Sequence, residues 1–278
     1  MTAHAAGPRP LAVAHRGDPY RHRENTLPSV AAALAAGADA VEVDVRLTRD
    51  GVPVLLHDPT LDRLWGLGRS VRALTAEQLA GQRFEGGHRV PRLTEALALL
   101  ADHPQARLMI DLDDPEPAAA SWRAVTEQGA EQRVLFCGPV SAMLAVRAVA
   151  AEVPIALTWE QPRVPAAALL ADLRPQYLNP PFGLVDRALV DRAGQAGLAV
   201  STWTVDLRRT MRRMRVAGVA SITSNRIGLL RSVLDRQHAV PALGRQHPAP
   251  GLGRHRPVPG PDQHRPAAGL DERPPAAR

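Results

Sequence analysis

The sequence predicts a (β/α)8 barrel of the TIM type, with a β-hairpin after the second strand and a disordered C-terminal tail. Of its 278 residues, 45% are hydrophobic and 22% are charged, a balance typical of a folded protein with a packed core. Short apolar and β-branched runs alternate with alanine- and leucine-rich stretches of helical length, the pattern of βα units around a parallel sheet. Eight of the nine predicted strands can run parallel, and eight strands in about 230 residues suit a compact α/β barrel.

The predicted elements follow one another along residues 9–236. The strands begin near Leu11, Ala40, Val52, Leu108, Arg133, Pro154, Gln176, Leu198 and Val219. Helices are predicted at Leu27–Ala36, Pro117–Gln128, Val140–Ala151, Val185–Ala196 and Leu207–Val216. We therefore expect most strands to be followed by a helix on the outside of the barrel.

The runs 40–48 and 52–57 are joined by only three residues, and a parallel crossover needs a dozen or more, so these two strands must be antiparallel. Asp50-Gly51 is a dipeptide preferred in tight hairpin turns. A two-residue turn there pairs residues whose numbers sum to 101, which places Asp44 opposite His57, with Glu42 on the same face. A slip of one residue in this register would weaken the grouping.

The chain divides by composition into a leader at 1–8, the barrel at 9–236 and a tail at 237–278 that is rich in proline, arginine and histidine. The tail cannot bury enough apolar surface to offset its ordering entropy, so we expect it to be disordered. The net charge is +6, all 34 basic residues are arginine, and the tail contributes six of them against three acids. Since no clustered basic surface is evident elsewhere, we expect no nucleic-acid partner.

Cysteine usage and hydropathy indicate the compartment. The single cysteine, Cys137, excludes an intrachain disulfide framework and fits a reducing environment. The first residues lack the apolar run of a signal peptide, and no apolar stretch is long enough for a membrane span. We therefore expect a cytoplasmic protein without membrane insertion; its oligomeric state is left open.

Three acidic residues occupy strand positions where apolar side chains normally lie: Glu42 and Asp44 on the second strand, and Asp111 on the strand that begins near Leu108. Such groups are costly to bury unpaired. A hard divalent cation with oxygen ligands from all three would remove their repulsion, and Mg²⁺ or Ca²⁺ suits carboxylates better than zinc does. The sequence therefore predicts a cation site at the barrel mouth.

Two histidines then remain free for acid–base chemistry. His15 ends the first strand and His57 ends the returning arm of the hairpin, so both are candidates for proton transfer, with Arg16 as a bidentate partner for a phosphate. Trp203 is predicted to line the substrate site or to belong to the barrel core. Arg63 and Trp65 are expected in a loop over the mouth.

The ordered motifs of the chain resemble the glycerophosphodiester phosphodiesterase family. The resemblance covers nearly all of residues 9–235 and rests on His15-Arg16-Gly17, Glu24-Asn25-Thr26, Gly37–Val45, Asp50–Val54, His57-Asp58, Arg63, Ser201–Asp206 and the ending Gly218–Leu230. It implies a metal-dependent barrel that hydrolyses glycerophosphodiesters, as small-molecule substrates, to sn-glycerol 3-phosphate and an alcohol. By the family pattern, His15 and His57 are the catalytic pair, Arg16 contacts phosphate, and Glu42, Asp44 and Asp111 hold the cation.

The sequence departs from this family pattern at Asp113, where the family usually carries a lysine near the phosphate. An anion beside an acidic site weakens phosphate binding unless Asp113 turns away or joins the metal shell. Asp111 is also a shorter acid than the more common glutamate. Two alternatives remain: a lysophospholipase D or sphingomyelinase D-like phosphodiesterase, and a catalytically silent barrel that binds a phosphorylated ligand.

Overall fold

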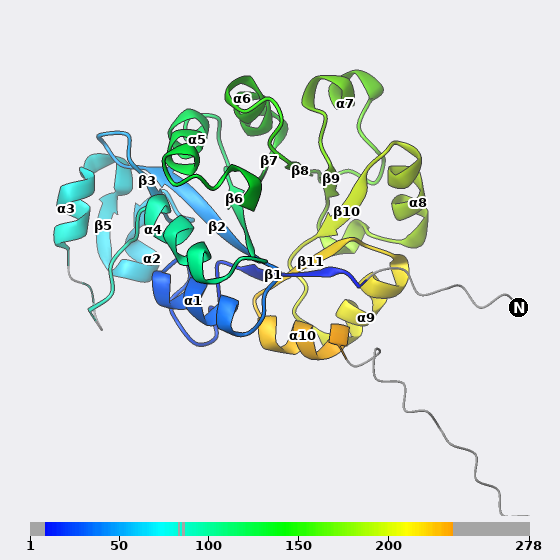
Figure 1. Ribbon diagram of the computed structural model, residues 1–278, viewed down its shortest axis with the longest axis horizontal. Helices are drawn as coiled ribbons and strands as arrows, with labels where there is room; N and C mark the ends of the chain where they lie inside the picture. The colour runs from blue at the N-terminus through cyan, green and yellow to red at the C-terminus, as the bar shows by residue number, and fades with distance from the viewer. Residues whose placement is uncertain (1–8, 83, 85–86, 236–278) are drawn as a thin grey trace, which may run out of the picture. The chain divides into compact units, whose positions relative to one another are not determined.

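Residues 9–82, 84 and 87–235 are described by the computed structural model, and in them eight parallel strands close into a barrel. The strands are β1 (Leu11–His15), β2 (Ala40–Leu47), β6 (Arg107–Asp111), β7 (Val134–Gly138), β8 (Ile155–Thr158), β9 (Tyr177–Asn179), β10 (Ala199–Thr202) and β11 (Ser221–Ser224). Each pairs with the next along the chain, and β1 pairs with both β2 and β11 (Figure 1). The predicted barrel is confirmed, whereas the predicted leader and tail lie outside the described residues.

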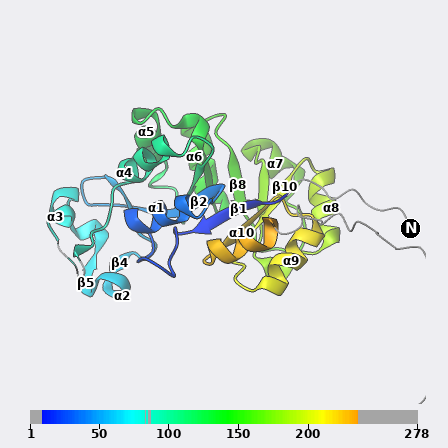
Figure 2. The same cartoon turned by 60° about the horizontal axis from the view of Figure 1, so that its bottom comes forward.

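Helices cover the outer surface of the strands (Figures 1 and 2). They are α1 (Leu27–Ala35), α4 (Leu93–Ala98), α5 (Ala118–Glu127), α6 (Val140–Val149), α7 (Ala167–Leu173), α8 (Arg187–Gln195), α9 (Arg208–Ala217) and α10 (Ile227–Asp235). Short 3₁₀ turns lie at Val71–Ala73, Leu99–Asp102, Glu131–Arg133 and Phe182–Leu184. The sequence did not predict α4, α7 or α10. The first two have six and seven residues, so they show little of the helical period.

Strand side chains alternate between the inside and the outside of the barrel. This alternation explains which residues form the core and where the acidic residues lie. On β2, Val41 and Val43 face outward into the large core between strands and helices, while Ala40 faces inward. Glu42 and Asp44 share the inward face of Ala40, because successive strand side chains point to opposite faces. The inward-facing apolar side chains fill the barrel interior nearer the amino ends of the strands. The carboxylates lie nearer the carboxyl ends.

The hairpin after β2 is confirmed, but its predicted register is wrong by one residue. Strand β3 (Pro53–Leu55) is antiparallel to β2 and pairs Val45 with Leu55. The loop has three residues: the Gly51 amide donates to the Thr48 carbonyl over 3.0 Å, and Gly51 has a φ of +76°. A type I turn followed by a left-handed glycine makes the loop one residue longer than the predicted two-residue turn.

The changed register alters how His57 reaches the site. The amide of Leu56, not that of His57, donates to the Asp44 carbonyl, over 3.1 Å. His57 therefore lies beyond the ladder, and the path of the chain after β3 brings it to the barrel mouth.

The segment after β3 forms a small lobe of its own. It contains β4 (Thr60–Leu61), α2 (Asp62–Trp65), β5 (Leu67–Ser70) and α3 (Ala76–Gly81). Trp65 is buried in a separate apolar cluster with Leu61 and Leu79, so the expectation of a loop that carries Trp65 over the mouth is wrong. None of the helices within the described ranges is long and apolar enough to span a membrane.

Candidate active site

A cavity of about 450 Å³ lies at the carboxyl ends of the barrel strands. Its walls include all seven residues for which the sequence predicts a catalytic, substrate-binding or cation-binding role: His15, Arg16, Glu42, Asp44, His57, Asp111 and Trp203. These residues come from β1, β2, β6 and the loops after β1, β3 and β10. In α/β barrels this end of the strands is where active sites form. The structure therefore brings the predicted side chains together around one cavity.

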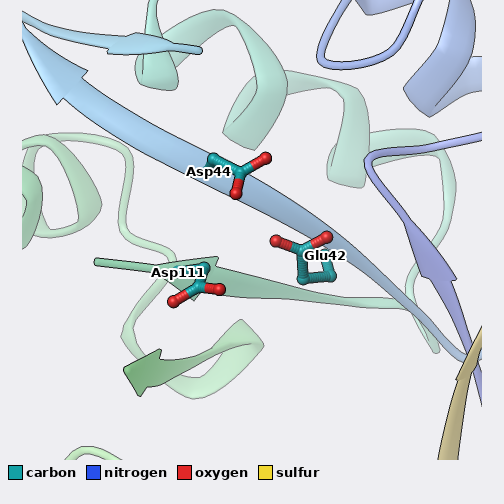
Figure 3. A group of neighbouring side chains, drawn as sticks. All are labelled: Glu42, Asp44 and Asp111. Carbon is teal, nitrogen blue, oxygen red and sulfur yellow. The ribbon is translucent and has the colours of Figure 1, made fainter. Parts of the chain in front are cut away.

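The three acidic side chains form a compact cluster on β2 and β6 (Figure 3). Oxygen atoms from Glu42, Asp44 and Asp111 all lie within 4.8 Å of one another. The strand register places Asp44 directly beside Asp111. Because carboxylate oxygens are the ligands that hard divalent cations prefer, these residues fit a cation such as Mg²⁺ or Ca²⁺.

The electrostatics of the cluster also favour a cation. Burial, and then repulsion from Asp44 and Asp111, raise the pKa of Glu42 well above its ordinary value. Burial, followed by repulsion from Asp44, raises the pKa of Asp111 to about 8. The Oε1 atom of Glu42 is buried and has no hydrogen-bond partner among the described residues. A bound cation would offset this repulsion and occupy the unpartnered oxygen.

Two residues of the β1–α1 loop, Arg16 and Asn25, bind the acidic cluster. The side-chain amide of Asn25 donates to Asp44 Oδ2 over 2.6 Å, and its oxygen accepts from the Asp44 backbone amide over 3.2 Å. The backbone amide of Arg16 donates to Glu42 Oε2 over 2.9 Å, and the Arg16 Nε atom lies 3.0 Å from Asp44 Oδ2. The positive charge of Arg16 thus balances part of the acidic cluster.

His15 is largely buried and has an amide partner. Its Nδ1 atom lies 2.7 Å from Oδ1 of Asn225, and its Nε2 atom lies 3.8 Å from Oε2 of Glu42. Burial, and then the positive charge of Arg16, lower the pKa of the imidazole from its ordinary value. His15 is therefore neutral at neutral pH, and its Nε2 atom lies beside the acidic cluster.

His57 is more exposed and has a carboxylate partner. Its side chain is 39% exposed, against 19% for that of His15. Its Nδ1 atom lies 2.7 Å from Oδ1 of Asp58, whose other oxygen accepts from Arg63 Nε over 2.5 Å. The hydrogen bond from Arg63, and to a lesser extent that from His57, lowers the pKa of Asp58. Asp58 therefore fixes the Nδ1 atom of His57, and Arg63 in turn fixes Asp58.

Asp113, the departure from the family pattern, has a cationic partner. The guanidinium of Arg46 pairs with Asp113 and with Asp114, and it also donates two hydrogen bonds to the carbonyl of His57, over 2.9 and 2.7 Å. Asp113 therefore turns toward Arg46. Arg46 neutralises a carboxylate that would otherwise oppose an anionic substrate.

The opposite wall of the cavity is less charged. Trp203 lines the cavity and donates from its Nε1 atom to the carbonyl of Asn179 over 3.0 Å, which holds the indole against the wall. Thr158 and Glu160 extend this wall. The cavity thus has one side rich in ionisable groups and one side suited to an uncharged or cationic moiety.

Comparison with known proteins identifies the family. The sequence model of the glycerophosphoryl diester phosphodiesterase family matches residues 15–229. The chain belongs to this family. It is 29% identical over 229 residues to the glycerophosphodiester phosphodiesterase of Caldanaerobacter subterraneus subsp. tengcongensis, a match that covers 77% of this chain and 93% of that protein.

Solved structures agree with this family membership. A crystal structure from Silicibacter pomeroyi DSS-3 superposes with a TM-score of 0.73 at 28% identity, covering 84% of this chain and 95% of that one. An Oleispira antarctica phosphodiesterase, solved in complex with its product sn-glycerol-3-phosphate, has a TM-score of 0.74 at 23% identity and shows the same fold. This match covers 82% of this chain and 97% of that one.

Sequence reasoning missed several residues that support the site in this family member. Asn225 and Asp206 follow β11 and β10, and Arg46 lies on β2, yet no role was predicted for any of the three. The usable signal was their position, since each lies at the carboxyl end of a barrel strand. Their partners could not be predicted, because each contact joins strands whose side-chain directions only the folded barrel fixes.

Proposed function

We propose that this family member hydrolyses glycerophosphodiesters to sn-glycerol 3-phosphate and an alcohol, with a divalent cation held by Glu42, Asp44 and Asp111. The observation that carries the proposal is the convergence of this buried carboxylate cluster and two histidines on one cavity. Family membership supports the reaction class. A cation bound there would supply positive charge to the phosphate oxygens.

The surroundings of the two histidines assign their roles. His15 is the general base, because it is neutral at neutral pH and its Nε2 atom lies at the acidic cluster. It takes a proton from the attacking oxygen nucleophile. His57, whose Nδ1 atom is held by Asp58, is the general acid and gives a proton to the leaving alcohol oxygen. Each of these transfers contributes about 10²- to 10⁴-fold to the rate.

Arg16 and Trp203 are proposed to hold the substrate. The guanidinium of Arg16 lies between Asp44 and Glu24 and lines the cavity, so it is positioned to face an incoming phosphate. Trp203 forms the wall beside which the organic part of the diester lies. We place the protein in the cytoplasm, a location that the single, buried Cys137 supports.

Release of sn-glycerol 3-phosphate from glycerophosphocholine by the purified protein tests this function. We expect turnover with Mg²⁺ or Ca²⁺, loss of turnover with chelator, and loss in both His15→Ala and His57→Ala. Turnover of a lysophospholipid in place of glycerophosphocholine would favour the lysophospholipase D alternative. No turnover of either substrate with any divalent cation would contradict the proposal and favour the silent barrel.

A further inference from the structure

The side chains behind His15 form a hydrogen-bonded chain that leads away from the cavity. Asn225 follows β11 directly, and its Oδ1 atom accepts from the Nδ1 atom of His15 over 2.7 Å. The Nδ2 atom of Asn225 donates to Asp206 Oδ2 over 2.8 Å. Asp206 follows β10, so this chain joins the ends of three neighbouring strands.

We propose that Asn225 and Asp206 are positioning residues that fix the tautomer and the orientation of His15. An ionised carboxylate can only accept hydrogen bonds, so Asp206 forces the amide nitrogen of Asn225 to face it. The amide oxygen of Asn225 must then face His15. Since an oxygen cannot donate, the proton of neutral His15 lies on Nδ1, and Nε2 presents its lone pair to the cavity.

Asp206 is itself held in place by hydrogen bonds from Ser224 and Asn225. Its Oδ1 atom accepts from the backbone amide of Asn225 over 2.9 Å and from the buried Ser224 hydroxyl over 3.0 Å. The backbone amide of Val205 donates to the Thr223 carbonyl over 2.9 Å and ties the loop after β10 to β11. Because hydrogen bonds engage both oxygens of Asp206, they hold the carboxylate in one orientation.

This role rests on the proposed function, because a fixed Nε2 lone pair matters only if His15 acts as a base. The role itself can be measured without turnover. In protein labelled with ¹⁵N-histidine, the chemical shifts of the two ring nitrogens report which one carries the proton. The His15→Ala variant identifies the His15 signals.

The test compares Asn225→Leu, Asp206→Asn and the reciprocal double variant Asp206→Asn/Asn225→Asp. Leucine removes the acceptor, and Asp206→Asn allows the Asn225 amide to rotate, so in both we expect His15 to populate the tautomer with the proton on Nε2. We expect kcat to fall by about 10²-fold, with KM nearly unchanged, since the base and not the binding contacts is disturbed.

The reciprocal variant restores the same polarity. The carboxylate at 225 accepts from His15 Nδ1, while the amide at 206 donates to it and still accepts from Ser224 and the backbone. We expect the wild-type tautomer and a kcat within about tenfold of wild type. Ser221→Ala is the matched control, because it removes a buried hydrogen bond to Ser201 between the same strands without touching His15.

Two results would overturn the positioning role. One is an unchanged His15 tautomer in Asn225→Leu; the other is a reciprocal variant that stays as slow as its single variants although its thermal unfolding matches wild type. If the wild-type protein showed no turnover but Asn225→Leu still changed the His15 tautomer, the result would contradict the proposed function and support the positioning role.

Discussion

The two histidines of the cavity differ in almost every physical property that sets their chemistry. His15 ends a barrel strand, is largely buried and bonds to the amide of Asn225, whereas His57 lies beyond a hairpin, is half-buried and bonds to the carboxylate of Asp58. Burial and the charge of Arg16 lower the pKa of His15, whereas His57 is held through its Nδ1 atom by an anionic partner. This difference supports the proposal that the two histidines transfer protons in opposite directions.

The largest effect we expect is from removal of His15, the proposed base. His15→Ala should lower kcat by about 10³-fold on every diester, whatever its alcohol, because the base removes the proton of the same nucleophile in all of them. Steady-state rates on glycerophosphocholine and on a glycerophosphodiester of nitrophenol measure this. Equal activity of His15→Ala and wild type on either substrate would contradict the role of base.

The second effect separates the two histidines. His57→Ala should lower kcat by about 10³-fold on glycerophosphocholine but by less than about tenfold on the nitrophenol diester, because nitrophenolate leaves without a proton. The measurement is the ratio of the loss of kcat on glycerophosphocholine to the loss of kcat on the nitrophenol diester. If His57→Ala is equally slow on both substrates and His15→Ala is rescued by the better leaving group, the two roles are reversed.

A smaller effect concerns Arg46, which binds the carbonyl of His57 and neutralises Asp113. Arg46→Gln should raise KM about tenfold, because the charge of Asp113 then opposes the phosphate. Asp113→Asn in the same chain should restore most of that loss. Arg72→Gln, which breaks a surface pair with Glu116, is the control and should leave KM unchanged. Additive effects of the two substitutions would refute the coupling.

The smallest effect is a pH dependence. The pKa of His15 lies below its ordinary value of 6.5, and a base works only when it is unprotonated. The rate should therefore hold as pH falls to 6.5 and decline only at lower pH. A profile of kcat/KM against pH measures this decline, and a loss of rate that begins above pH 6.5 would contradict a buried, neutral His15.

The sequence predicted the barrel well because its signals are local. Runs of alternating strands and helices need no long-range information, and the positions of Glu42, Asp44 and Asp111 at strand ends indicated one site. The register of the hairpin failed because Asp50-Gly51 fits turns of two lengths, and only the left-handed conformation of Gly51 in a three-residue loop decides between them.

Contacts across the barrel could not be predicted in the same way. Asn225 reaches His15 across 210 residues, and Arg46 reaches Asp113 across 67 residues. Each contact depends on which strands are neighbours and on where their side chains point. For that reason the acidic cluster was predicted, while the partners of His15 and of Asp113 were found only in the folded structure.

Cation binding, measured together with turnover, tests the account most directly. Titration of Mn²⁺ into wild type, Glu42→Gln and Asp111→Asn, followed by assay of each sample for sn-glycerol 3-phosphate release, uses one preparation for both readouts. We predict one tight ion per wild-type chain, and weaker binding with matching loss of turnover in both variants. Full turnover in metal-free protein, or tight binding that survives both substitutions, would contradict a cation held by these carboxylates.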